Sequence, residues 1–178
     1  MFYPVNSYRK ALLEKDYESI AQTVINYEGL RNKTFFITGA TGLIGSFLVR
    51  TLLYMNDHYQ LGASIYALVR DTDKAQAIYA DYLLSNSLQF VKGDVEHFNL
   101  EDLPHLDYII HAAAITASKT MVEHPIDVLK SSFWGTQRIL DLAVTHQVQN
   151  TLYISSMESY GTMMIECPID ESQLGYIN

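Results

Sequence analysis

The chain has 178 residues, of which 48% are hydrophobic and 18% charged, a composition typical of a folded globular protein with one domain as the default. Its formal net charge of −8 argues against non-specific binding to nucleic acid. The only cysteine, Cys167, excludes an internal disulfide, and neither a signal-peptide profile nor a long apolar run is present, so we expect a cytoplasmic protein without a membrane partner.

Residues 1–30 precede the first predicted strand, and we expect them to form an N-terminal helical extension. Asp16 can cap a helix there and Gly29 can end it. A helix with an apolar stripe packs against its own domain or a partner subunit. Residues 31–178 then form the main domain that we expect. The stripe at helical spacing consists of Ile20, Val24 and Tyr27.

A glycine-rich segment lies between the predicted strand at residues 34–37 and a helix that includes residues 47–53. Strand, glycine turn and helix in this order bind a dinucleotide pyrophosphate, because the first-turn N–H groups and the positive helix end hold the anion. Gly39 permits the tight turn, Gly42 lets backbone amides approach the phosphates, and Gly45 lets the helix pack close to the strand. The residues expected at the cofactor are Gly39, Thr41, Gly42, Leu43, Ile44 and Gly45.

Further strands and helices alternate along the chain. Strands that alternate with helices imply parallel pairing and right-handed crossovers. The sequence therefore predicts an α/β fold, a three-layer doubly wound parallel sheet of the Rossmann type with strand order 3-2-1-4-5. The later strands are expected at 64–69, 88–91, 107–110 and 150–155, and the later helices at 71–82 and 126–146. The core positions expected on the last helix are Val128, Ile139, Leu142 and Ala143.

The end of the second predicted strand bears on the choice of cofactor. An acidic residue there binds the ribose 2′-hydroxyl of NAD, whereas an arginine favours the 2′-phosphate of NADP. This chain has Arg70 followed by Asp71. Arg70 can make a bidentate contact with a phosphate, or it can stack on the adenine while Asp71 takes the ribose. We therefore expect NAD or NADP, with a slight preference for NADP.

The spacing Gly-x-x-Gly-x-x-Gly of the glycine segment resembles the extended branch of the short-chain dehydrogenase/reductase superfamily, which includes the NAD-dependent epimerase/dehydratase family. The resemblance covers roughly residues 31–161. It implies that Asp94, in Gly-Asp-Val after the third strand, accepts a hydrogen bond from the adenine amino group, with Val95 beside it. A turn-forming Gly-Asp pair is the alternative.

The segment after the fourth predicted strand resembles the family's His-x-Ala-Ala motif. Small residues are needed there because the backbone passes against the cofactor. We expect His111 to be a structural histidine at the strand end and not an acid or base. The residues expected to line the cofactor are Ala112, Ala113 and Ala114.

Residues 153–161 resemble the family's fifth-strand motif, in which a Ser or Thr four residues before a Tyr-Gly pair hydrogen-bonds the substrate. This implies that role for Ser156, because ligands lie beyond the carboxyl ends of parallel strands. A serine that caps a turn is the alternative. Sugar dehydratases of the family have an Asp-Glu pair next, but here it is Met157-Glu158. That change argues against a standard 4,6-dehydratase and leaves Glu158 as the candidate acid or base.

The chain departs from the family pattern in two places. Ser132 stands where the family commonly has asparagine, and no tyrosine is followed by lysine four positions on. The family's catalytic base is the tyrosine of Tyr-x-x-x-Lys, whose pKa is lowered by the lysine and the cofactor. We therefore expect the chain to be the N-terminal part of a longer enzyme, truncated before the substrate lobe and inactive alone.

The resemblance implies a parent enzyme that modifies a nucleotide sugar by epimerisation, dehydration or decarboxylation, with hydride transfer at a sugar hydroxyl. An NADP-dependent carbonyl reductase of the dihydroflavonol or hydroxysteroid type is an alternative, which Arg70 would suit. A non-catalytic dinucleotide sensor is another. The expected partner is a small-molecule substrate, a homodimer is an expected assembly, and no metal site is predicted.

Overall fold

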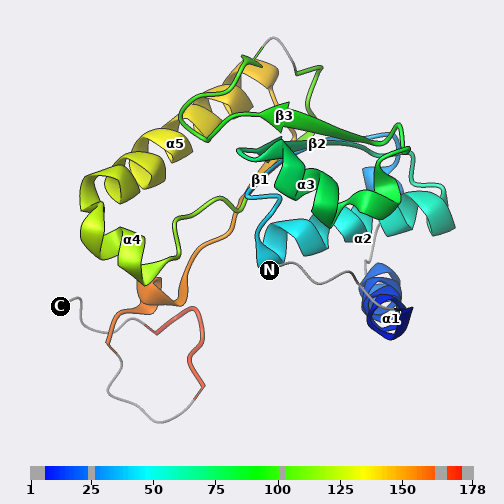
Figure 1. Cartoon of the computed structure of the whole chain (residues 1–178), viewed down its shortest axis with the longest axis horizontal. Coiled ribbons are helices and arrows are strands. Elements are labelled where there is room, and N and C mark those ends of the chain that lie inside the picture. Colours follow the sequence, from blue (N-terminus) through cyan, green and yellow to red (C-terminus); the bar gives the residue numbers. More distant parts are fainter. Residues whose placement is uncertain (1–6, 24–26, 101–102, 163–167, 174–178) are drawn as a thin grey trace.

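The computed structural model describes residues 7–23, 27–100, 103–162 and 168–173, and these contain a five-stranded parallel sheet with the order β3-β2-β1-β4-β5 (Figure 1). The predicted fold class and strand order are confirmed. The strands are β1 Thr34–Thr38, β2 Ser64–Val69, β3 Leu88–Lys92, β4 Tyr108–His111 and β5 Asn150–Tyr153.

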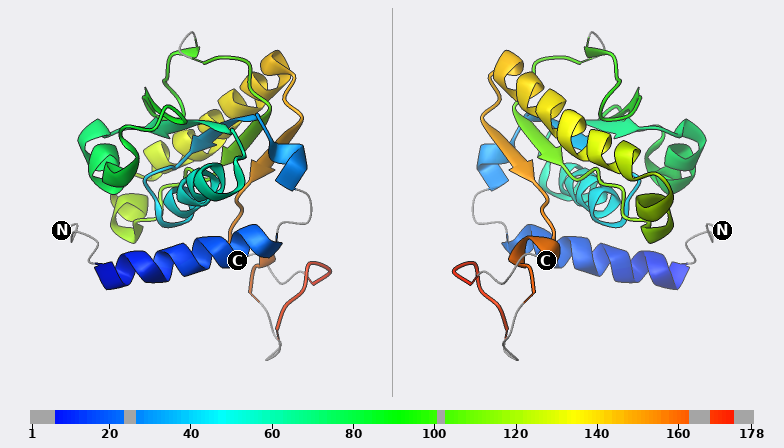
Figure 2. Two further views of the ribbon diagram at one scale, coloured as in Figure 1. Left: turned by 90° about the vertical axis from the view of Figure 1, so that its right-hand side faces the viewer. Right: turned by 90° about the vertical axis from the view of Figure 1, so that its left-hand side faces the viewer.

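Helices cover both faces of this sheet (Figure 1, Figure 2). α2 and α3 cover one face and α5 covers the other, while α1 lies on the far side of α2 from the sheet. The α-helices are α1 Ser7–Thr23, α2 Leu43–Tyr59, α3 Thr72–Ile78, α4 Ser118–Glu123 and α5 Pro125–His146. The 3-10 helices are η1 Tyr27–Leu30, η2 Ala80–Tyr82 and η4 Met157–Tyr160.

The central strand β1 is buried on both faces, which explains why it reads as an unbroken apolar run. Phe35 and Ile37 pack into the core under α2, whereas Phe36 packs into the core under α5. Of the core positions expected on α5, Ile139 and Leu142 are buried against that second face. The alternation of side chains along β1 thus divides the interior into two cores, one for each helical layer.

The N-terminal helix differs from its prediction. α1 begins at Ser7, so Asp16 lies inside the helix instead of capping it. Tyr17 and Ala21 form its buried face, whereas Ile20 is 38% exposed. Val24 lies outside the described residues, and Tyr27 begins η1 instead of continuing the helix.

Aromatic packing against α2 determines which face of α1 is buried. The Tyr17 ring lies 5.0 Å from that of Phe47 and 6.0 Å from that of Tyr54. A large ring held between two others buries more apolar surface than an isoleucine at the adjacent helix edge. The contact on α2 therefore sets the orientation of α1, and spacing within the sequence of α1 alone does not reveal it.

Other elements also differ from the sequence analysis, and the helix expected at 71–82 is α3 followed by the short η2. β5 ends at Tyr153, two residues before the expected Ser155. The short helix α4 was not predicted, and it ends at Glu123, with His124 as its C-cap at a φ of −133°. The following Pro125 disfavours helical geometry at His124, so the chain breaks there and begins α5 as a separate helix.

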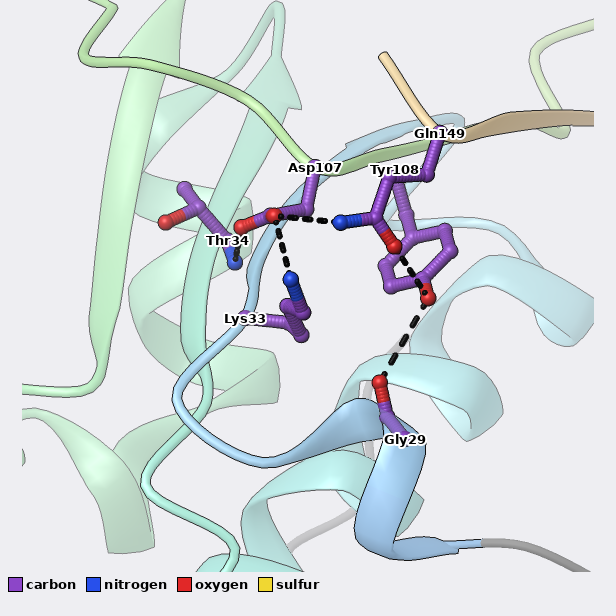
Figure 3. Close-up of polar contacts among 6 residues, drawn as sticks. All are labelled: Gly29, Lys33, Thr34, Asp107, Tyr108 and Gln149. Atoms are coloured by element: carbon purple, nitrogen blue, oxygen red, sulfur yellow. Dashed lines mark hydrogen bonds and ion pairs between the residues drawn. The ribbon is translucent and has the colours of Figure 1, made fainter.

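Asp107 joins three strands at their amino ends (Figure 3). Its carboxylate accepts hydrogen bonds from Lys33 Nζ at 2.9 Å and Thr34 N at 2.9 Å, before and at the start of β1. It also accepts one at 3.2 Å from Gln149 Nε2, before β5. Burial opposes ionisation of Asp107, but the hydrogen bonds from Lys33 and Thr34 outweigh it and hold the pKa of this carboxyl below its usual value.

A tyrosine extends the same network. Tyr108 donates its hydroxyl to Gln149 Oε1 at 2.9 Å, and the same hydroxyl lies 3.5 Å from the carbonyl oxygen of Gly29 in η1 (Figure 3). The amino ends of β1, β4 and β5 are thereby connected to the segment that leads from α1 into the sheet.

We expect Asp107→Asn to lower the free energy of unfolding by about 2 kcal/mol near neutral pH, a typical contribution of hydrogen bonds to a charged group. The pKa of Asp107 is lower in the folded chain than its ordinary 3.8, so the wild type has this stability above pH 3.8 and loses it as the pH falls through the folded pKa. Urea unfolding at several pH values should show the two proteins converging in acid.

Asp57→Asn is the matched control, because Asp57 is exposed on α2. Its free energy of unfolding should stay within about 0.5 kcal/mol of the wild type at every pH. If the deficit of Asp107→Asn were constant down to pH values well below 3.8, the carboxylate charge would not be what stabilises the three strands.

Candidate functional site

A cavity of about 430 Å³ lies at the carboxyl ends of β1, β2, β3 and β4. Ligands of doubly wound folds bind at this edge of the sheet. The structure brings together here all twelve residues expected at the cofactor: Gly39, Thr41, Gly42, Leu43, Ile44, Gly45, Arg70, Asp94, Val95, Ala112, Ala113 and Ala114.

Six residues that the sequence analysis did not assign to the cofactor also line the cavity: Leu68, Lys74, Gly93, Ile115, Thr116 and Ser131. Lys74 lies in the first turn of α3, four residues after Arg70. Its place in the first turn of a helix expected directly after the end of the second strand was a usable signal. Ser131 comes from α5, and nothing local in the sequence relates it to the strand ends.

The glycine loop is built by close backbone approaches. Gly39 has φ +66°, and a Cβ there would lie 2.5 Å from the carbonyl oxygen of Ala112 after β4. A Cβ on Gly45 would lie 2.2 Å from the carbonyl oxygen of Gly39. The loop is closed by a hydrogen bond of 2.9 Å from Gly42 N to that same oxygen. The loop, α2 and the end of β4 are therefore in backbone contact.

Gly42 differs from these two glycines. Its φ of −81° and ψ of 175° are values that any residue adopts, and a Cβ there would meet only the Gly39 carbonyl oxygen, at 3.2 Å. Gly42 is the N-cap of α2 and provides no side-chain hydrogen bond to the helix. The first-turn amides of α2, which have no intrahelical acceptor, are thus left for another group that accepts hydrogen bonds.

Two cationic residues line the cavity beside the end of β2. Arg70 is exposed at the strand end, and Lys74 follows in α3. Asp71 does not line the cavity, and its Oδ1 accepts a hydrogen bond of 2.9 Å from Lys74 N as the N-cap of α3. At this edge the side chains presented to a ligand are cationic.

Asp94 has a structural role in addition to its place in the cavity. Its Oδ1 accepts hydrogen bonds of 2.8 Å each from the backbone N–H groups of Glu96 and His97. Gly93 before it has φ +155°, and a Cβ there would lie 2.4 Å from the carbonyl oxygen of His97. This tight turn presents the half-buried carboxylate at the cavity wall, so the turn-forming role and the position expected for adenine recognition coexist.

His111 is buried at the end of β4 and is held on both ring nitrogens. Nδ1 lies 2.7 Å from Thr38 Oγ1 and Nε2 lies 3.2 Å from Thr136 Oγ1 on α5. Thr38 Oγ1 also accepts a hydrogen bond of 3.1 Å from Ala113 N. Burial lowers the pKa of His111, which favours the neutral imidazole. This network fixes residues 112–114, the alanine wall of the cavity, relative to β1 and α5.

Ser156 and Glu158 do not line the cavity, and both side chains are exposed. Ser156 is the N-cap of η4, and its Oγ accepts a hydrogen bond of 3.2 Å from Glu158 N. Ser159 Oγ donates to the carbonyl oxygen of Ser156 at 2.7 Å. The turn-capping geometry considered for Ser156 is therefore present, beyond the carboxyl end of β5.

Across residues 7–23, 27–100, 103–162 and 168–173, no group of three His, Cys, Asp or Glu side chains is arranged to hold a metal ion. No helix within the described part of the chain combines the length and the apolar character needed to cross a membrane.

The family model and the similar proteins indicate the same family. The profile of the NAD dependent epimerase/dehydratase family matches residues 35–176. UDP-glucose 4-epimerase of Rickettsia prowazekii (strain Madrid E) is 28% identical over 127 residues, which amount to 70% of this chain and 37% of that enzyme. This chain thus spans well under half the length of that relative.

Solved structures show the same fold. A double mutant of a dTDP-glucose 4,6-dehydratase from Streptomyces venezuelae, solved with NAD bound, is 27% identical with a TM-score of 0.67, covering 79% of this chain and 45% of that one. UDP-glucose 4-epimerase of Thermotoga maritima, solved with UDP-glucose, is 18% identical with a TM-score of 0.62, covering 82% of this chain and 45% of that one. At that lower identity, the second likeness concerns the fold alone.

The glycine geometry predicts different outcomes at two positions. We expect Gly45→Ala to lower the free energy of unfolding by about 2 kcal/mol, because the clash with the Gly39 carbonyl outweighs the better helix propensity of alanine. Gly42→Ala should cost no more than about 1 kcal/mol, since its Cβ would lie close to a single atom, the Gly39 carbonyl oxygen at 3.2 Å, which has to shift only slightly. Chemical denaturation of both variants measures the difference. Equal losses would mean that the close approach at Gly45 relaxes without cost.

Proposed function

The chain belongs to the NAD dependent epimerase/dehydratase family, and we propose that it binds NAD or NADP in the cavity at the carboxyl ends of β1 to β4. The observation that carries this proposal is Gly42. Its backbone conformation does not require glycine, and the space that a side chain would occupy belongs to the cavity, beside uncapped helix amides. An anionic group lying on the first turn of α2 explains both features.

Each wall of the cavity suits one part of a dinucleotide. The first turn of α2 would hold the pyrophosphate, with Thr41 at the loop. Asp94 would accept from the adenine amino group through the oxygen that the turn does not use, with Val95 against the ring. The alanine segment, residues 112–114, would lie along the cofactor without bulky side chains. Nicotinamide supplies a hydride acceptor when it is bound.

For the whole protein we propose the modification of a nucleotide sugar. The named relatives act on UDP-glucose and dTDP-glucose, and this chain matches only part of each. Ser156 and Glu158 are the residues of this chain proposed to contact the sugar, because they follow the carboxyl end of β5 at the edge of the sheet where ligands bind. Residues 31–178 would be the cofactor-binding unit and residues 1–30 an extension packed on it.

We expect Gly42→Val to weaken dinucleotide binding at least about tenfold, because a branched side chain would project into the space of the pyrophosphate. Titration calorimetry with NAD and with NADP measures the affinity of the wild type and the variant. Ala11→Val is the control, since Ala11 is exposed on α1 and no residue of that helix lines the cavity. Unchanged affinity in Gly42→Val would remove the glycine loop from the binding site.

The choice between NAD and NADP depends on the two cationic residues beside the end of β2. Arg70 and Lys74 both line the cavity, whereas Asp71 caps α3 and does not. A ribose 2′-phosphate would meet two positive side chains there. This arrangement supports a preference for NADP, and it is the observation that favours an NADP-dependent reductase as the second candidate function.

We expect Arg70→Ala to weaken NADP binding by about 1.5–3 kcal/mol, the usual contribution of a charged hydrogen bond, and Lys74→Ala to weaken it by a smaller amount. NAD binding should barely change in either variant. Lys130→Ala is the matched control, because it removes one positive charge from α5 outside the cavity. A wild type that binds NAD more tightly than NADP would refute the proposed preference.

A further inference from the structure

A buried tyrosine is hydrogen-bonded to the glycine loop from outside the cavity. Tyr79 follows α3 directly and has no exposed surface. Its hydroxyl donates a hydrogen bond of 2.6 Å to the carbonyl oxygen of Ala40, which lies 39 residues earlier in the chain. Tyr79 does not line the cavity, so it would not touch a bound dinucleotide.

The direction of this hydrogen bond determines what the loop presents to the cavity. In a trans peptide unit the C=O and N–H groups point in opposite directions. A carbonyl of Ala40 fixed toward the buried hydroxyl of Tyr79 therefore turns the N–H of Thr41 away from the core. Thr41 itself lines the cavity, whereas Tyr79 does not.

The tyrosine ring is itself held by three elements. Arg50 on α2 donates to the carbonyl oxygen of Ile78, the last residue of α3, and its guanidinium lies 6.0 Å from the centre of the Tyr79 ring. The ring of Phe90 on β3 lies 5.8 Å away on centroids. The position of the hydroxyl thus depends on α2, α3 and β3, and side-chain rotation is not free to release the loop.

We propose that Tyr79 is a positioning residue for dinucleotide binding, which holds the Ala40–Thr41 peptide so that the Thr41 N–H faces the cofactor phosphates. This inference rests on the proposed function. Burial raises the pKa of the Tyr79 hydroxyl, which keeps the donor protonated over the working pH range. Without this donor the Ala40–Thr41 peptide can rotate in the free protein. Dinucleotide binding must then order the loop, and the entropy lost in this step lowers the affinity.

Tyr79→Phe is the test, because phenylalanine keeps the ring and removes only the donor. We expect the dissociation constants for NAD and for NADP to rise roughly tenfold in calorimetry. Tyr82→Phe is the matched control, since this nearby hydroxyl in η2 lies at the α1 side of the same core and should leave affinity unchanged. Ile139→Val, in the core under α5, serves as a second control that lowers stability without touching the loop.

A spectroscopic measurement separates positioning from general stability. In ¹H–¹⁵N spectra of the free protein, the Thr41 amide should shift strongly in Tyr79→Phe and stay in place in Tyr82→Phe and Ile139→Val. An unmoved Thr41 amide, or unchanged affinity in Tyr79→Phe when the wild type binds, overturns the inference. A wild type that binds neither dinucleotide overturns the proposed function instead, and the Thr41 shift would still report whether Tyr79 sets the loop.

Discussion

The fold depends on the contact of three backbones with no side chain between them. A Cβ at Gly39 would clash with the carbonyl group of Ala112, and a Cβ at Gly45 would clash with the carbonyl group of Gly39. The end of β1, the start of α2 and the end of β4 consequently sit at one fixed spacing. The cavity floor is defined by this spacing, and the alanine wall is then fixed through the hydrogen bonds of Thr38 and His111.

The two ends of the sheet perform different tasks. At the amino ends, a buried carboxylate binds the strands together through charged hydrogen bonds (Figure 3). At the carboxyl ends, the main chain turns through tight loops that leave amides and small residues facing a cavity. The amino ends thus hold the strands together through a side chain, whereas the carboxyl ends are held by backbone contacts that leave a cavity between the loops.

The sequence was most informative where chemistry follows directly from strand order. Parallel strands bring their carboxyl ends to one edge, so Arg70 could be placed there from its position, whereas Asp94 and the alanine segment were assigned through the family resemblance. The hydrogen bond from Tyr79 to Ala40 could not be predicted, because a contact between residues 39 positions apart leaves no periodic pattern in the sequence. The buried face of α1 was mispredicted for a related reason: Tyr17 is selected by rings on another helix.

The topology of the central strand also sets the order in which the protein can form. β1 pairs with β2, which follows it closely in the chain, and with β4, whose junction with β1 at Asp107 and Thr34 joins residues 73 positions apart. Closing a longer loop costs more chain entropy, so we expect β1, α2, β2, α3 and β3 to assemble first during synthesis. Tyr79 and the glycine loop belong to that early half, whereas the alanine wall arrives only when β4 docks. The nascent protein would thus have its glycine loop in place before residues 112–114 complete the cavity.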